Sequence, residues 1–220
     1  MGQLSFYSAD AHPRAVTDLE GVLCAQGQVL RFGRGSTARL GITLGTAATP
    51  EADPEHADDP EHPDDPEPDP LVAWRAHALR CAFHTRGVDA EVRPEPDGTV
   101  GVRSAFRADL VALARRWGGG TKAVPADLEL DGPRLRLWVL AAGRRDRRAY
   151  VLGLDPLAPS THEPLRAAAA RAGLDTTLDP TTDPAADAPV LRLTGVRRLR
   201  RLAELVGDPP RHLIDEVWPG

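Results

Sequence analysis

The sequence predicts an α+β fold in which an αββαββα unit occurs twice in one chain. The first observation is that stretches with helical spacing of apolar residues alternate with stretches of period two. The second is that the order of these stretches in residues 1–120 recurs in residues 121–220. The third is that 220 residues with 41% hydrophobic content can bury a sizeable core. We therefore expect two repeats, 1–120 and 121–220, the second of which ends in a Pro-rich tail.

The first repeat begins with a helix and two strands. In TARLGITL, Leu40, Ile42 and Leu44 alternate with polar or small residues, which is the spacing of a strand with one buried face. The expected elements are, in order, a helix at 14–26, strands at 28–34 and 37–45, a helix from 71 that carries Val72, Ala76, Leu79 and Phe83, strands near 88–92 and 100–102, and a helix that carries Phe106, Leu110, Leu113, Ala114 and Trp117 and ends at Gly118.

The second repeat follows the same order. Ser160 and Glu163 have the spacing of a capping box, and Gly173 has the position of a helix stop. The expected elements are a helix at 133–142, a hairpin whose second strand is 148–154, a helix from Ser160 through Ala172, strands near 174–178 and 189–194, and a last helix with Leu199, Leu202, Ala203 and Val206 on its inner face.

Charge is unevenly distributed along the chain. Residues 51–69 hold ten acidic and no basic residues, whereas the remaining chain has 27 basic against 22 acidic residues, a net charge of +5. This acidic stretch is dense in Pro and has no hydrophobic periodicity, so we expect residues 47–70 to be a disordered acidic insertion within the first repeat. Such a loop either competes with anionic ligands for the basic remainder of the chain, in which case its deletion tightens their binding, or only adds solubility.

Composition excludes several classes of protein. No apolar run approaches the roughly 20 residues that a membrane span needs, and the N-terminus lacks the pattern of a signal peptide, so we expect a cytoplasmic protein without membrane contact. Cys24 and Cys81 have no metal-ligand spacing and are expected to be buried free thiols. The chain has a single Lys, 26 Arg and no Asn, which is typical of a GC-rich bacterium. Arginine abundance alone is therefore weak evidence for a function.

Two nine-residue stretches give the repeats a family resemblance. LEGVLCAQG at 19–27 and LRLWVLAAG at 135–143 resemble the signature of LAGLIDADG homing endonucleases, including the N-terminal domain of the sporulation regulator WhiA. The resemblance extends over about 15–207. Gly21, Gly27 and Gly143 fit the signature, whereas Leu137 stands where the family usually has a small residue. The resemblance implies a pseudo-two-fold saddle-shaped sheet with helices on one face.

The resemblance also implies where catalytic acids would lie. Active members carry an acid at the eighth signature position of each helix, and these positions hold Gln26 and Ala142 here. Neither side chain replaces a carboxylate in a two-metal site. Glu20 precedes Gln26 by six residues and therefore points to a different helix face. Asp146 and Asp155 bracket the second hairpin and fit either a metal role or ordinary loop carboxylates. We expect a catalytically inactive protein without metal or cofactor.

In the family, the sheet face without helices binds DNA, and strand alternation places arginines on that face here. Alternation predicts this position for Arg31, Arg39, Arg93, Arg103 and Arg192, and the hairpin residues Arg34, Arg145 and Arg148 are expected to extend the face at the tips. These eight arginines are the residues predicted to bind nucleic acid. We therefore expect double-stranded DNA as the partner of a monomer, with a possible regulatory role. Two alternatives stay open. An arginine-rich chain places arginine on any solvated strand, beside acids such as Asp89 and Glu91, and the fold could instead serve as a protein-protein interaction module.

Overall fold

The two-repeat architecture is confirmed. A computed structural model describes residues 6–45, 69–118, 120–179, 188–210 and 217–219. The first repeat contains η1 (Ala9–Ala11), η2 (Val16–Leu19), α1 (Glu20–Cys24), β1 (Gln28–Phe32), η3 (Gly33–Gly35), β2 (Thr37–Leu44), α2 (Pro70–His84), β3 (Ala90–Pro94), β4 (Val100–Ser104) and α3 (Val111–Arg116). The second contains α4 (Gly132–Ala142), β5 (Gly143–Asp146), β6 (Ala149–Gly153), η4 (Pro159–Thr161), α5 (His162–Arg171), β7 (Thr177–Asp179), β8 (Val190–Thr194) and α6 (Val196–Val206).

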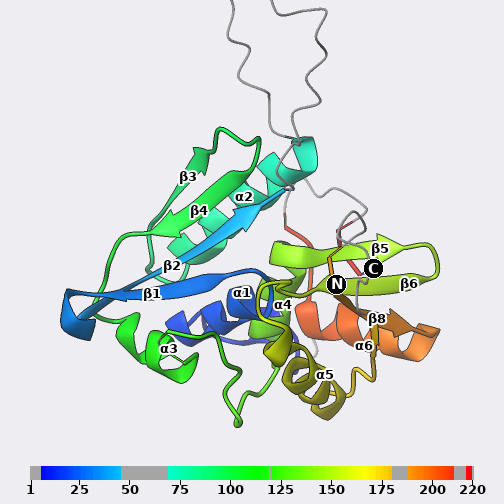
Figure 1. Cartoon of the computed structure of the whole chain (residues 1–220). Helices are drawn as coiled ribbons and strands as arrows, with labels where there is room; N and C mark the ends of the chain where they lie inside the picture. Colours follow the sequence, from blue (N-terminus) through cyan, green and yellow to red (C-terminus); the bar gives the residue numbers. More distant parts are fainter. Residues whose placement is uncertain (1–5, 46–68, 119, 180–187, 211–216, 220) are drawn as a thin grey trace, which may run out of the picture.

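Each repeat forms one antiparallel sheet of four strands. The strand orders are β1-β2-β4-β3, hereafter sheet A, and β5-β6-β8-β7, hereafter sheet B, so the second repeat copies the topology of the first. In Figure 1, α2 passes behind β2 and β4 of sheet A. The strand residues that face this helix are buried, as Leu40 and Val102 show. The opposite face of each sheet is called the open face here, and the two sheets with their helices give the expected α+β fold.

Several element boundaries differ from the sequence-based expectation. The helix expected at 14–26 consists of a 3-10 turn followed by the short α1, which ends at Cys24. Phe106 precedes α3, and Ser160 makes no side-chain cap because it lies inside η4. Asp69 and Pro70 do not belong to the acidic loop but begin α2, where the Asp69 carboxylate accepts hydrogen bonds from two backbone amides. The rest of the expected disordered insertion lies outside the described residues.

The two signature helices, α1 and α4, pack against each other in the centre of the molecule (Figure 1). Gly21 makes this close approach possible, because a Cβ atom at that position would collide with the Arg134 carbonyl and lie 2.9 Å from Leu137 Cβ. Leu137 is fully buried. The bulky residue in the second helix is therefore accommodated by the glycine of the first.

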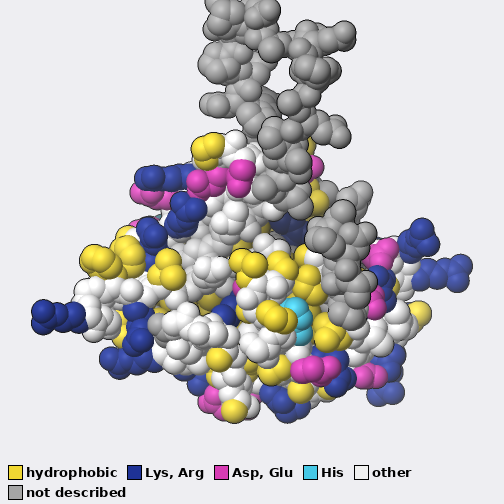
Figure 2. All heavy atoms as spheres, in the orientation of Figure 1, with side chains coloured by type: hydrophobic (Ala, Val, Ile, Leu, Met, Phe, Trp, Pro, Cys, Tyr) yellow, Lys and Arg dark blue, Asp and Glu magenta, His cyan; other side chains and the backbone are white. Residues whose placement is uncertain are grey.

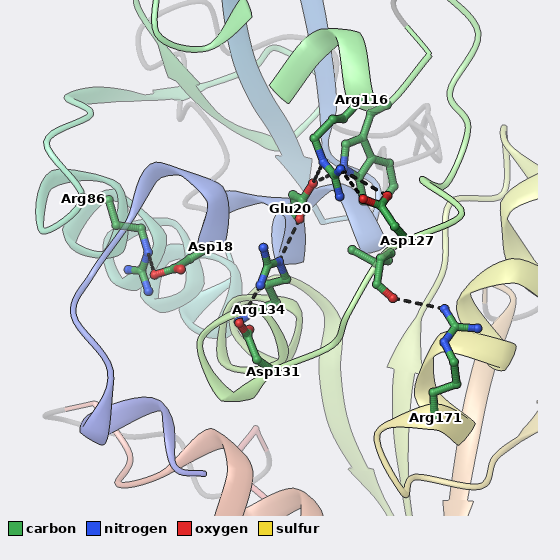
Figure 3. Close-up of polar contacts among 10 residues, drawn as sticks. Asp18, Glu20, Arg86, Arg116, Asp127, Asp131, Arg134 and Arg171 are labelled. Carbon is green, nitrogen blue, oxygen red and sulfur yellow. Dashed lines mark hydrogen bonds and ion pairs between the residues drawn. The ribbon is translucent and has the colours of Figure 1, made fainter. Parts of the chain in front are cut away.

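A network of ion pairs around one buried carboxylate also joins the repeats (Figure 3). The Glu20 carboxylate is 1% exposed and accepts hydrogen bonds from Arg116 Nε at 2.8 Å, Arg134 Nε at 2.8 Å and Trp117 Nε1 at 3.3 Å. Arg116 also pairs with Asp127, and Arg134 with Asp131. Three charge-assisted donors thus satisfy one buried acid, as its burial requires. Glu20 has a structural role, which agrees with the expectation that it does not replace the missing signature acid.

The end of the described chain packs on the second repeat. Trp218 is 3% exposed, donates from its indole nitrogen to the Gly207 carbonyl at 3.0 Å, and lies under the Arg136 guanidinium. These contacts dock Trp218 on the second repeat. No helix within the described ranges is both long enough and apolar enough to span a membrane.

Candidate nucleic-acid interface

Strand register decides which arginines lie on the open face of sheet A. Leu40 of β2 is buried, so its neighbours Arg39 and Gly41 point to the opposite side of the sheet. Gly41 is paired with Arg103 of β4, and Gly101 of that strand is paired with Arg93 of β3. Residues paired across antiparallel strands share a face. Arg39, Arg93 and Arg103 therefore lie together on the open face, as predicted.

Arg31 lies on the other side, so this placement was wrong. It is paired with Ala38 and follows Val29, which is paired with Leu40, and this row faces the helices. The apolar row of β1, Leu30 and Phe32, is the row on the open face. The prediction assumed that apolar strand residues point inward, whereas Leu30 is 52% and Phe32 67% exposed.

Arg34 lies in η3, the turn between β1 and β2, and it is exposed. Its φ of 58° belongs to the left-handed region that side chains rarely adopt. The flanking Gly33 and Gly35 also have positive φ values, so they permit this tight turn. The hairpin therefore carries an arginine at its tip, next to the open face.

The open-face arginines of sheet A differ in their partners. Arg93 pairs with Glu91 at 2.9 Å and Arg103 with Glu95 at 2.7 Å. The side chains of Arg93 and Glu91 are each more than two thirds exposed, so water screens their attraction, and a phosphate could compete for the arginine. Arg39 instead lies over the Phe106 ring, and the distance from Arg39 Cζ to the ring centroid is 4.7 Å.

Sheet B does not provide a matching basic face. Arg145 is paired with the buried Tyr150, lies on the helix side and donates to the Trp218 carbonyl at 2.9 Å. The prediction that it extends the open face at the hairpin tip was therefore wrong. Arg192 lies on the open face, but it forms ion pairs with both Asp146 and Asp179. The hydrogen bonds that Arg192 donates to these two carboxylates raise the pKa of Arg192 and lower the pKa of Asp146.

Arg148 lies in the turn between β5 and β6, where it lines a hollow of about 270 Å³. That hollow lies on the helix side, because Leu199 and Ala203 of α6 line it as well. The predicted site residues therefore divide into two groups. Arg39, Arg93, Arg103 and, at the hairpin tip, Arg34 form one surface, whereas Arg31, Arg145, Arg148 and the paired Arg192 are not part of it.

Gln26 and Ala142, at the eighth signature positions, line one hollow of about 430 Å³ between the two sheets, which residues of α2 line as well. Thr43 of sheet A and Gly153 of sheet B line it too. The charged residues in its described lining are Asp69, which caps α2, and the arginines Arg75 and Arg144. Both signature helix ends thus lie at one hollow, but the groups around them are an amide, a methyl group, two guanidinium groups and the Asp69 carboxylate, which accepts hydrogen bonds from the first backbone amides of α2.

Basic side chains bind the carboxyl ends of both signature helices. Arg75 of α2 is buried and donates to the carbonyls of Val139, Leu140 and Gly143 at the end of α4. Lys122 donates to the Ala25 carbonyl at the end of α1. Positive charge is favourable at a helix carboxyl end, where carbonyl groups lack partners. Burial lowers the pKa of both Arg75 and Lys122.

The residues at these helix ends do not fit a pair of divalent metals. Asp155, the carboxylate near Lys122, is 4% exposed in its side chain and pairs with the Lys122 ammonium at 2.9 Å. Its second oxygen accepts from the Leu157 amide. Asp146 is held by Arg192 on the second hairpin. In the part of the chain that the structure describes, no three His, Cys, Asp or Glu side chains are grouped as a metal site requires.

The two cysteines differ from each other. Cys24 is fully buried, and burial raises the pKa of its thiol well above the usual range. Cys81 is exposed, so its expected burial was wrong: it lies on α2, and its sulfur is 3.6 Å from His77 Nε2. Both thiols are free, as expected.

The aromatic part of the open face was not among the predicted site residues. Phe32 and Phe106 lie 5.2 Å apart between ring centroids, at an interplanar angle of 39°. Phe106 was assigned to the inner stripe of a helix, but it lies before α3 and is 40% exposed. The sequence of β1 could have indicated this surface, because Leu30 and Phe32 lie on one face of the strand and Val29 lies on the other, so that both faces carry apolar residues. One of these faces had to be exposed.

The solved structures that resemble the chain include a homing endonuclease and a LAGLIDADG domain. The homing endonuclease I-WcaI bound to its DNA recognition sequence matches with a TM-score of 0.51 and 12% identity, over 93% of this chain and 83% of the endonuclease chain. The N-terminal LAGLIDADG domain of WhiA matches with a TM-score of 0.48 and 8% identity, over 89% of this chain and 82% of that domain. No protein-family model and no curated protein matches the sequence. The match to the endonuclease shows the fold: this chain has a LAGLIDADG-like fold.

Proposed function

We propose that this protein binds DNA through the open face of sheet A without cleaving it. The observation that carries the proposal is the placement of Arg39, Arg93 and Arg103 on one uncovered sheet face by strand register, with Arg34 at the adjoining hairpin tip. Exposed arginines on a surface without covering helices are suited to phosphate contacts. The endonuclease of the same fold is bound to DNA.

The absence of cleavage follows from the chemistry at the two helix ends. Phosphodiester hydrolysis by a metal pair needs carboxylates that bind both ions. Gln26 offers one neutral oxygen and Ala142 offers none. The nearby guanidinium groups of Arg75 and Arg144 repel a divalent cation, since like charges in a partly desolvated hollow interact strongly. The proposed function is therefore that of a DNA-binding regulatory protein and not of a nuclease.

The proposal is tested by titrating a fluorescent DNA duplex with the full-length protein at several salt concentrations. Four to five phosphate contacts predict a slope of log affinity against log salt near −4, because each contact contributes roughly −0.9. In a parallel assay, supercoiled plasmid incubated with the protein and Mg²⁺ or Mn²⁺ is expected to stay intact. Binding without salt dependence contradicts the binding proposal, and metal-dependent nicking contradicts the proposed inactivity.

A further inference from the structure

We propose that the open face of sheet A recognises single-stranded DNA, by stacking unpaired bases on Phe32 and neighbouring apolar side chains while arginines hold the phosphates. This inference rests on the proposed function, since it names the form of DNA that the same face binds. It starts from Phe32 and Phe106, whose rings form a tilted pair with centroids 5.2 Å apart, and from the Arg39 guanidinium above the Phe106 ring.

The open face is divided into an apolar row and a basic row. The apolar row consists of Phe32 and Leu30 of β1, and it continues to Leu157, which lines the same hollow of about 380 Å³ as Leu30. The basic row consists of Arg39 of β2 and Arg103 of β4, which line that hollow as well. Leu30 and Arg39 are paired across β1 and β2. Because neighbouring strands lie about 4.8 Å apart, the two rows run side by side.

This arrangement matches the chemistry of a single strand better than that of a duplex. A duplex buries the faces of its bases in the stack and presents phosphates and polar base edges to a protein. Phe32, Leu30 and Leu157 have no groups that bond to those edges, yet they are 67%, 52% and 84% exposed. An unpaired base presents an apolar face that stacks on an aromatic ring or on a guanidinium plane, while its phosphate remains available to a cation.

The surface view supports this division. Figure 2 shows hydrophobic side chains gathered at the left end of the molecule, over β1 and β2, with basic side chains beside them. Sheet B offers no second aromatic platform in the described residues, and its Arg192 is paired with two carboxylates. The two halves therefore lack the equivalence that a symmetric duplex contact would use. The single-stranded partner needs only the face of sheet A.

The test compares an oligothymidylate of about 12 nucleotides, within the usual site size of such platforms, with a duplex of equal length. Fluorescence anisotropy is measured with the full-length protein. We expect the single strand to bind more tightly. Phe32→Ala should weaken that binding by about fivefold or more without changing its salt slope, because stacking releases no counterions. Phe32→Tyr should retain affinity, and Val196→Ala, an exposed apolar residue of α6, should leave it unchanged.

The possible failures are distinguishable. If duplex and single strand bind equally and Phe32→Ala changes neither, the stacking inference is overturned while the proposed DNA binding stands. If neither DNA binds, both are overturned. A matched oligouridylate that binds as tightly as the DNA strand contradicts the choice of DNA. Thermal melting of Phe32→Ala, expected to match the unmodified protein because the side chain is exposed, excludes unfolding as the cause of a loss.

Discussion

Arg134 Nε of α4 donates to Glu20 Oε2 of α1 at 2.8 Å, and this ion pair joins the first signature helix to the second. The acid is buried and the arginine is 18% exposed in its side chain. Breaking a buried pair leaves an uncompensated charge, which is one of the costlier changes that a fold can undergo. Glu20 therefore stabilises the relative placement of the two repeats.

Glu20→Gln is expected to lower the free energy of unfolding by about 2 kcal/mol or more, because it removes a charged acceptor from two arginines and an indole. The measurement is urea denaturation at neutral pH. Asp127→Asn is the matched control, since its carboxylate pairs with the same Arg116 but is 74% exposed. It should cost less than about 1 kcal/mol. Equal effects of the two substitutions would refute the structural role of Glu20.

Gly21→Ala is expected to destabilise the protein by about 1–3 kcal/mol, because the added methyl group meets the Arg134 backbone, which cannot move as a side chain can. Gly120→Ala is the control. A Cβ atom there meets nothing within 4 Å, so stability should be unchanged or slightly higher. The comparison is made by thermal melting. A Gly21→Ala protein as stable as the control would show that α1 and α4 do not cross as closely as described.

Removing the acids of sheet B is expected to strengthen DNA binding. Asp146→Ala combined with Asp179→Ala leaves Arg192 without its two ion-pair partners, so it becomes available to a phosphate. The salt slope should become steeper by about one contact. The control is the double variant Asp127→Ala and Glu163→Ala, which removes the same number of negative charges from positions outside both open faces. It should leave the salt slope of DNA binding unchanged. A slope that responds equally to both pairs would indicate an effect of net charge alone.

Because Cys24 is buried, we expect the protein to lose stability in alkaline solution. Burial raises the pKa of this thiol in the folded state above the value of about 8.5 in an unfolded chain. The folded protein then holds a proton that the unfolded chain releases. The contribution of Cys24 to the free energy of unfolding is therefore fully present below a pH of about 8.5, and it decreases as the pH rises above that value. The loss approaches about 1.4 kcal/mol per pH unit for one group.

Denaturation of the unmodified protein and Cys24→Ala between pH 8 and about 10 isolates this contribution. The stability of the alanine variant should fall less with pH, so the difference between the two proteins should narrow as pH rises. Other titrating groups, such as Lys122, are common to both proteins and do not enter this difference. A difference that stays constant over this range contradicts the burial of a neutral thiol at Cys24.

The sequence predicted the fold well because both periodicity and element order are local signals that the structure preserves. It predicted the open-face positions of Arg39, Arg93 and Arg103 because these residues lie in strands whose inner faces are clearly apolar. It failed at Arg31 and Arg145, where the strands are short and carry apolar or basic residues on both faces. Only the pairing with a neighbouring strand decides the direction of such residues.

Other features could not be predicted because they depend on contacts between distant segments. Arg75 belongs to α2, yet it binds the end of α4, more than 60 residues later in the chain. Lys122 likewise binds the end of α1 from a connecting segment. Neither position has a local motif. Their cationic groups at the signature helix ends became apparent only from the three-dimensional arrangement.

The central claim is that the open face of sheet A binds DNA through its arginines. It is tested most directly by the salt slope of DNA binding in the triple variant Arg39→Ala, Arg93→Ala and Arg103→Ala. The control is Arg80→Ala, Arg115→Ala and Arg166→Ala, which removes the same charge from α2, α3 and α5. The claim predicts that the slope shrinks by about three contacts in the first variant and stays unchanged in the second. Equal slopes in the two variants would contradict it.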